Sequence, residues 1–209
     1  MVSNRLRIRF TKEGDLRLIS HRDLVRTMER LFRRADVPLA MSQGFHPKPR
    51  MTIPAALALG VSGENEVMDI AIAEEFSADE IHARLSEHAP TGMKINSAVA
   101  LAPEMPKARV ESATYQVEVP PERREEIASA VAQLLAHESF LIERAKGNKT
   151  FDLMADLQEL RLEDDALVFT LRIRPEGAIR ATEVLDALAA ADLPELGFPV
   201  ARTDVELAS

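Results

Sequence analysis

The sequence predicts an α+β fold made of two tandem ferredoxin-like units, each with the element order βαββαβ. Segments that alternate apolar and polar residues, typical of half-buried strands, are interleaved with segments whose apolar residues recur at helical spacing. After a proline-containing stretch at 102–107 the same order of elements begins again, although the two halves share no sequence repeat. We therefore expect an N-terminal domain at 1–102, a linker at 103–109 and a C-terminal domain at 110–209.

The first strand and the first helix have the clearest patterns. Residues 5–10 alternate strictly, with apolar side chains on one face and arginines on the other, which predicts a half-buried strand. Ser20 and Asp23 form a capping-box-like start for a helix that runs to about Ala35, with apolar residues at i, i+4, i+7 and i+8. The other elements expected in this unit are strands at 51–53, 55–59, 66–73 and 93–101, and a helix that begins after Ser77 and ends near His88.

The second half repeats this order. Its expected elements are strands at 113–119 and 140–144, helices at 121–137 and 181–191, a hairpin of 157–162 with 167–173, and a last strand at 200–207.

The composition excludes several kinds of site. The chain has no Cys, which rules out a cysteine nucleophile, a thiolate zinc site and an iron–sulfur cluster. No run of about 18 apolar residues occurs, and the first residues lack the apolar region of a signal peptide. We therefore expect a soluble, cytoplasmic protein with no membrane partner.

Charge is divided unevenly along the chain, whose net charge is -8. Residues 1–52 contain 12 Lys and Arg against 5 Asp and Glu, whereas the remaining residues contain 14 against 29. A basic block on an otherwise acidic chain favours an anionic ligand on one surface. A solvated basic face that binds nothing is the alternative interpretation.

The candidate ligand-binding residues belong to the first strand, the first helix and a proline-rich loop at 42–50. They are Arg5, Arg7, Arg9, Ser20, His21, Arg22, Asp23, Arg26, Arg30, Ser42, Gln43, Phe45, His46, Lys48 and Arg50. Arginine suits a phosphate ligand because its planar guanidinium donates two parallel hydrogen bonds. To act together, the strand row, the helix stripe and the loop have to face one groove.

Aromatic residues are scarce, with no Trp and one Tyr, and only Phe45 among the phenylalanines lies in a polar context. A sheet that stacks RNA bases on two or three exposed aromatic side chains is therefore not expected. Recognition of an RNA backbone or shape, or a phosphate-bearing small ligand held by the loop, are the alternatives that fit the basic block.

Catalytic motifs are missing from the sequence. It contains no nucleophile elbow, P-loop or dinucleotide-binding glycine motif, and its five histidines lack metal-ligand spacing. We expect no catalytic residue, no metal and no cofactor. The alternative is a metal-independent enzyme that acts on a phosphate-containing substrate through Ser20, His21, Asp23 and His46. A polar loop at 146–153 is a weaker candidate site, and a solvated hairpin tip is the favoured interpretation of it.

Several short motifs occur in a characteristic order: ISHRDL at 19–24, RADVP at 34–38, SQGFHPKPR at 42–50, LGVSG at 59–63, and then Glu66 and Asp69. In this order they resemble the uncharacterised, radical-SAM-associated DUF2344 family over the whole chain. Arg22, His46 and Lys48 stand where that family tends to have Leu, Asn and His. The KTFD segment at 149–152 resembles a short K-x-x-D element of the family.

The resemblance implies a partner, namely a radical SAM protein that also carries a cobalamin-binding-like domain. Because this chain has no Cys, it cannot hold the cluster of such an enzyme itself. We expect a non-catalytic accessory or substrate-binding module that binds RNA or another phosphate-rich ligand through its basic N-terminal half. A docking domain for the radical SAM partner, with the acidic second half as its surface, is the alternative.

Overall fold

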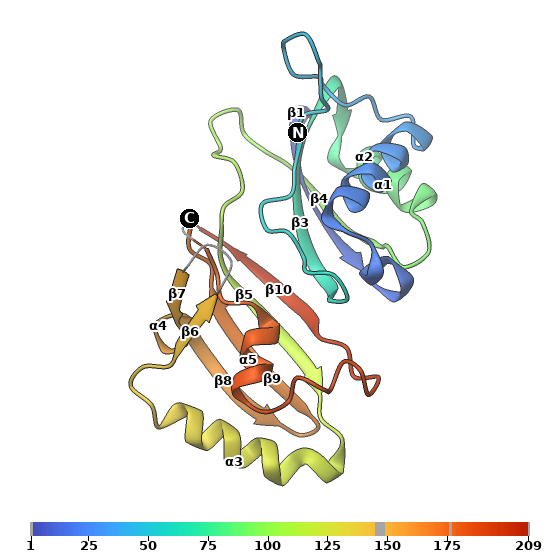
Figure 1. The fold of residues 1–209 in the computed structure, drawn as a ribbon. Coiled ribbons are helices and arrows are strands. Elements are labelled where there is room, and N and C mark those ends of the chain that lie inside the picture. Colours follow the sequence, from blue (N-terminus) through green and yellow to red (C-terminus); the bar gives the residue numbers. More distant parts are fainter. Residues whose placement is uncertain (1, 145–148, 176, 209) are drawn as a thin grey trace. The chain divides into compact units, whose positions relative to one another are not determined.

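The computed structural model describes residues 2–144, 149–175 and 177–208 (Figure 1). It divides into two compact units, one of residues 1–109 with 208–209 and the other of residues 110–207. We call them the N-terminal unit and the C-terminal unit. The α+β class expected from the sequence is confirmed, since both units combine a sheet with helices. The segment at 103–109, expected as a linker, belongs to the N-terminal unit.

The sheet of the N-terminal unit has the strand order β4-β1-β3, with the short β2 paired to β3. Strand β1 runs antiparallel to both of its neighbours. The elements of this unit are β1 (Val2–Lys12), a 3-10 helix (Gly14–Leu18), α1 (His21–Arg34), β2 (Met51–Thr52), β3 (Ser62–Ser77), α2 (Ala78–His88) and β4 (Ile95–Ala100).

Alternation along β1 separates the core of this unit from its opposite face. Leu6, Ile8 and Phe10 are 0% exposed and pack in one cluster with the apolar residues of both helices. The arginines between them therefore point to the face of the sheet that α1 and α2 do not cover. On α1 the buried residues are those of the predicted apolar stripe: Leu24, Met28, Leu31 and Phe32.

The predicted capping box of the second helix is confirmed. The Glu80 N–H donates to Ser77 Oγ at 3.2 Å, and the Ser77 N–H donates to Glu80 Oε2 at 2.9 Å. Both N–H groups lie at the first turn of α2, where the helix itself offers no acceptor. Serine and glutamate at this spacing therefore fix the residue at which β3 ends and α2 begins.

The C-terminal unit has a four-stranded antiparallel sheet in the order β10-β5-β9-β8 and a separate β6-β7 hairpin. The core includes Val117, Phe169 and Leu171 from the sheet and Ile127 from α3. The elements are β5 (Val110–Glu118), a 3-10 helix (Pro121–Arg123), α3 (Arg124–Leu135), β6 (Leu141–Arg144), β7 (Lys149–Asp152), α4 (Leu153–Asp156), β8 (Leu157–Glu163), β9 (Ala166–Arg172), α5 (Ala181–Ala187) and β10 (Ala201–Leu207).

Three segments differ from the sequence-based expectation. Residues 55–59 form no strand, because Pro54 lacks an N–H and Gly60 turns the chain with a φ of 84°. Helix α5 ends at Ala187 rather than near 191, since Ala189 adopts the left-handed conformation with a φ of 51°. In the expected polar loop at 146–153, residues 149–152 form β7, and residues 146–148 lie outside the described part of the chain.

Candidate anion-binding cleft

A cleft of about 790 Å³ lies in the N-terminal unit. It is lined by the start of β1, the middle of β3, the chain from Ala40 to Thr52, and the segment that contains Met105 and Lys107. Of the residues singled out in the sequence, the structure brings together Arg5, Ser42, Lys48 and Arg50 in this cleft. Lys107 and Asp69 also line it, although neither is among the ligand-binding residues expected from the sequence.

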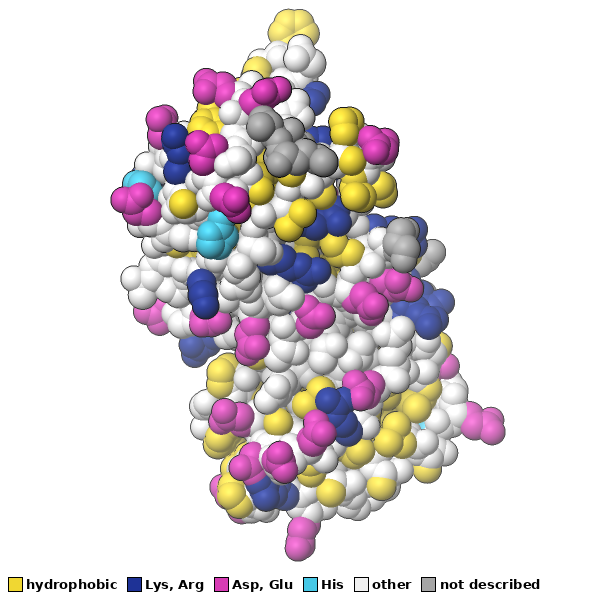
Figure 2. Space-filling model, turned by 180° about the vertical axis from the view of Figure 1, so that it is seen from behind, with side chains coloured by type: hydrophobic (Ala, Val, Ile, Leu, Met, Phe, Trp, Pro, Cys, Tyr) yellow, Lys and Arg dark blue, Asp and Glu magenta, His cyan; other side chains and the backbone are white. Residues whose placement is uncertain are grey.

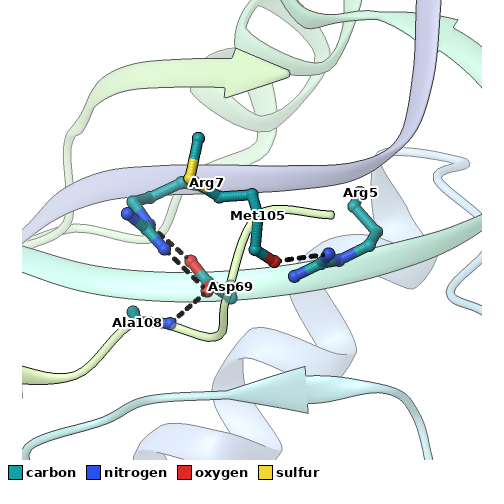
Figure 3. A network of polar contacts seen from close by, with 5 residues as sticks. All are labelled: Arg5, Arg7, Asp69, Met105 and Ala108. Atoms are coloured by element: carbon teal, nitrogen blue, oxygen red, sulfur yellow. Dashed lines mark hydrogen bonds and ion pairs between the residues drawn. The ribbon is translucent and has the colours of Figure 1, made fainter. Parts of the chain in front are cut away.

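Arg5 fixes one wall of the cleft. Its Nη1 donates to the carbonyl oxygen of Pro103 at 3.0 Å. The same Nη1 donates to the carbonyl oxygen of Met105 at 2.8 Å (Figure 3). These bonds hold the segment from 103 to 109 against β1, and this places Lys107 at the cleft. Arg5 therefore positions a second basic residue while it keeps its own positive charge.

Asp69 is the only carboxylate of the described lining, and Arg7 pairs with it. Arg7 Nε donates to Oδ1 at 2.8 Å, and Arg7 Nη2 donates to Oδ2 at 3.1 Å (Figure 3). The N–H of Ala108 donates to the same Oδ2 at 2.8 Å. The side-chain hydrogen bond to Asp69 raises the pKa of Arg7. The guanidinium of Arg7 thus forms an ion pair with Asp69, and its positive charge compensates the negative charge of that carboxylate.

The proline-rich loop is closed at its base by a ladder of hydrogen bonds. The N–H of Ser42 donates to the Lys48 carbonyl at 2.8 Å, and the N–H of Lys48 donates to Ser42 Oγ at 2.9 Å. One step further, the N–H of Arg50 donates to the Ala40 carbonyl at 2.7 Å, and the N–H of Ala71 on β3 donates to the Arg50 carbonyl at 2.9 Å. These bonds fix the backbone of Lys48 and Arg50 beside β3.

The charge of the cleft is positive. Arg5, Lys48, Arg50 and Lys107 line it, whereas the carboxylate of Asp69 is shared with Arg7. Within the part of the chain that the structure describes, no carboxylate pairs with Lys48, Arg50 or Lys107. On the face shown in Figure 2, Asp and Glu side chains are spread among Lys and Arg, which form no broad field there. A local basic cleft of this kind suits a ligand with a few closely spaced negative charges.

The candidates on α1 do not line the cleft. Ser20 caps the helix, since its Oγ accepts the N–H of Asp23 at 3.2 Å and donates to Asp23 Oδ2 at 2.7 Å. Arg26 Nη1 also donates to Asp23, at 3.2 Å. The hydrogen bond from Ser20 lowers the pKa of Asp23, with a smaller contribution from Arg26. His21, Arg22 and Arg30 are exposed.

The groove expected to join the strand row, the helix stripe and the loop does not form. Helix α1 packs on the face of the sheet that carries Leu6 and Ile8, whereas Arg5, Arg7 and Arg9 lie on the opposite face. Of that row only Arg5 lines the cleft, since Arg7 is held by Asp69 and Arg9 Nη1 donates to the Asn65 carbonyl at 3.1 Å. The cleft thus combines one arginine of the strand row with the proline-rich loop.

Gln43, Phe45 and His46 lie at the tip of the proline-rich loop, are exposed, and do not line the cleft. Among the described residues no three His, Asp or Glu side chains cluster in a way that would hold a metal ion. No helix of the described chain is long and apolar enough to span a membrane.

A second cleft, of about 610 Å³, lies in the C-terminal unit and has the opposite charge. Glu118, Glu163, Asp164 and Asp165 line it together with Arg161. Arg161 is paired with two of its neighbours, Glu163 first and Glu159, and these hydrogen bonds raise its pKa. The lining of this cleft carries more carboxylates than cations, so its charge is opposite in sign to that of the first cleft.

Lys107 and Asp69 had only partial signals in the sequence. Asp69 lies on a segment that alternates apolar and polar residues, as a strand does, and such a strand can pair with the strand that carries the arginines. This pattern indicates that Asp69 can face an arginine, but it does not identify the arginine. Lys107 follows Pro106 in a segment with no periodic pattern, and nothing there indicates that it returns to β1.

Comparison with known proteins identifies a family for the chain. No curated protein matches the chain. The family model described as "Uncharacterized protein conserved in bacteria (DUF2344)" matches residues 5–185, which include every lining residue of the cleft except Asn4. The chain therefore belongs to the DUF2344 family.

Proposed function

We propose that the protein is a non-catalytic binding module that holds RNA or another phosphate-rich ligand in the cleft of its N-terminal unit. The observation that carries this proposal is the convergence of Arg5, Lys48, Arg50 and Lys107 around a lining whose one described carboxylate is paired with Arg7. Guanidinium groups offer paired donors to phosphate oxygens, and ammonium groups add point charges.

In the same proposal, both units are ferredoxin-like. The strand orders β4-β1-β3-β2 and β10-β5-β9-β8 support it, since each fits a βαββαβ unit in which the first and third strands are central. The C-terminal unit carries the β6-β7 hairpin and α4 as an insertion between its first helix and its second strand. Such a unit leaves one face of its sheet uncovered by its own helices, and the cleft lies on that side of the N-terminal unit.

The proposed role is to hold a ligand for a radical SAM partner. The support for the partner is the resemblance of the sequence motifs to the radical-SAM-associated DUF2344 family. Because the chain has no Cys for a cluster, its own contribution would be the basic groups of the cleft, which suit an anion. The Ser42 hydroxyl oxygen in the lining accepts the Lys48 N–H, so its contact stiffens the loop. The protein would thus contribute affinity and orientation, and its partner the chemistry.

Binding of total cellular RNA to the purified full chain at about 50 mM and about 200 mM salt tests the proposal. The double variant Lys48→Glu/Arg50→Glu should weaken binding by at least about tenfold, and its salt slope should fall by about 0.7 per lost phosphate contact. The matched control is Arg22→Glu/Arg30→Glu, which changes the charge equally on exposed α1 positions outside the cleft.

The control variant should bind RNA as the wild type does. Equal losses in both variants would show that net charge alone governs binding, and unchanged binding in the cleft variant would overturn the proposal.

A pull-down with the same variants tests the partner. It measures the retention of a radical SAM protein encoded beside a family member. Loss of that retention in the α1 control alone would assign the basic surface to a protein contact.

A further inference from the structure

We propose that the ligand of the cleft is single-stranded RNA and that Phe45 stacks on one of its unpaired bases. This inference rests on the proposed function and names the class of ligand for the same site. The basic residues of the cleft suit phosphate groups, and contacts with phosphates do not distinguish one base from another. A flat apolar side chain beside those contacts adds a preference for nucleotides whose bases are accessible.

Phe45 is the aromatic side chain that is presented to solvent. Its relative exposure is 103%, whereas Phe10, Phe32 and Phe169 are at most 1% exposed and Tyr115 is 7% exposed. All eight phenylalanines lie in the described part of the chain, and the remaining four are half-buried. A fully solvated phenyl ring forgoes the free energy that burial of its apolar surface would contribute, and it is free to contact a ligand.

The loop presents this ring on a stiff support. In Figure 1 the chain between α1 and β3 stands out from the N-terminal unit as an open loop. The hydrogen bonds between Ser42 and Lys48 close its base, and Pro47 and Pro49 restrict the backbone φ angle of its returning side. Gly44 has a φ of 124°, a conformation that L side chains rarely adopt, and it turns the chain just before Phe45. Because the loop is already stiff, few of its rotatable bonds become ordered on binding, and the loss of conformational entropy is small.

The ring lies close to the cleft along the chain. Phe45 and Lys48 are three positions apart in the chain, so their Cα atoms are at most about 11 Å apart. Arg50 follows two residues later on the same side of the loop, where it lines the cleft with Lys48. A strand whose phosphates contact Lys48 and Arg50 can therefore place a neighbouring base on Phe45. A duplex cannot do this, because its bases are stacked within the helix.

The composition of the protein provides a direct probe of stacking. The chain has no Trp, so Phe45→Trp introduces a single indole at the loop tip. We expect a single-stranded 12-nucleotide RNA to quench its fluorescence, and neither the same sequence as a duplex nor tripolyphosphate to do so. Tripolyphosphate tests the cleft without a base, and the duplex tests phosphates without an accessible base.

Affinity measurements on three variants separate stacking from simple apolar contact. Phe45→Tyr should bind the single strand as the wild type does, and Phe45→Leu should bind it about 5- to 150-fold more weakly, since leucine has no π-face. Neither variant should change binding of tripolyphosphate. The matched control is Leu59→Ala, which removes another exposed apolar side chain, 67% exposed, of the same unit and should leave RNA affinity unchanged.

The outcomes distinguish this inference from the proposed function. Wild-type affinity of Phe45→Leu for the single strand, together with a loss in Lys48→Glu/Arg50→Glu, overturns stacking and keeps the phosphate cleft. Wild-type affinity in both variants overturns both. Equal quenching of the Phe45→Trp indole by duplex and single strand also overturns the inference, because the ring would then report proximity and not an unpaired base.

Discussion

Arg7 and Asp69 face each other across β1 and β3, and their side chains are joined by hydrogen bonds of 2.8 Å (Nε to Oδ1) and 3.1 Å (Nη2 to Oδ2). The pair is largely shielded, with side-chain exposures of 20% for Arg7 and 9% for Asp69. Because Asp69 also accepts the N–H of Ala108, the same carboxylate fastens the segment from 103 to 109 to the sheet. One ion pair thus removes a repulsive charge from the cleft and holds its wall.

Removal of that carboxylate should loosen the wall. Asp69→Ala leaves Arg7 without its acceptor and frees the N–H of Ala108, so the free energy of unfolding should fall by about 1.5–3 kcal/mol. Urea unfolding measures the change, and hydrogen exchange should show loss of protection at Ala108. In the control, Asp36→Asn, the carboxylate is exposed and 3.9 Å from Arg84, and its loss should cost at most about 1 kcal/mol. Equal effects of the two changes would contradict the assigned role of Asp69.

In the C-terminal unit, Arg144 joins the β6-β7 hairpin to α5 by two hydrogen bonds of 2.6 Å to Glu183. The partners' side chains are 17% and 12% exposed. Burial on its own would raise the pKa of Glu183, but hydrogen bonds from Arg144 and from the N–H of Arg180 lower it below its ordinary value. Glu183→Gln keeps the shape of the side chain and removes its charge. It should lower the free energy of unfolding at pH 7 by about 1.5–3 kcal/mol.

The pH dependence of that loss has a fixed sign. A carboxylate whose pKa is lowered in the folded state stabilises the protein above its unfolded pKa, and the stabilisation disappears as pH falls through the folded pKa. The difference between wild type and Glu183→Gln should therefore be largest at neutral pH and shrink toward about pH 3. Urea midpoints at both pH values measure it. A difference that grows on acidification would refute the pair's contribution.

The capping box of α2 makes a separate prediction about helix stability. Ser77→Ala removes the oxygen that accepts the N–H of Glu80 and should cost about 1 kcal/mol. Ser86→Ala is the control, since Ser86 is exposed within the same helix, where alanine is the better helix former. Thermal unfolding should therefore show a lower midpoint for the first variant and an unchanged or slightly higher one for the second. Identical shifts would mean that the cap contributes nothing.

Gly92 has a conformational and a steric reason to be glycine. Its φ is 82°, and a Cβ added there would overlap the carbonyl oxygen of Glu13, whose own N–H donates to the Gly92 carbonyl at 2.7 Å. Gly60 has a similar φ of 84°, but nothing lies within 4 Å of its added Cβ. Gly60→Ala thus reports strain alone, about 1–2 kcal/mol. Gly92→Ala should cost clearly more in urea unfolding, and equal costs would exclude the steric contribution.

Short-range patterns were enough to predict several local elements of the N-terminal unit. The alternation of residues 5–10 predicted which face of β1 is buried, and Ser20 and Ser77 marked the first turns of α1 and α2. These features depend on residues within a few positions of one another, through strand pleat, helical periodicity and capping. The departures at 55–59 and at the end of α5 came from backbone conformations at Gly60 and Ala189, which side-chain patterns do not report.

By itself, therefore, the sequence determined the α+β class, the basic character of the first 52 residues, and a proline-rich loop whose phenylalanine lies in a polar context. Only the tertiary structure decided which basic side chains lie together in the cleft. Arg5 and Lys107 are about a hundred positions apart and come together because Arg5 binds the carbonyls of Pro103 and Met105. The arginines of α1 are nearer to Arg5 in sequence, yet they lie outside the cleft, because a helix that packs on one face of a sheet leaves its polar residues away from the other.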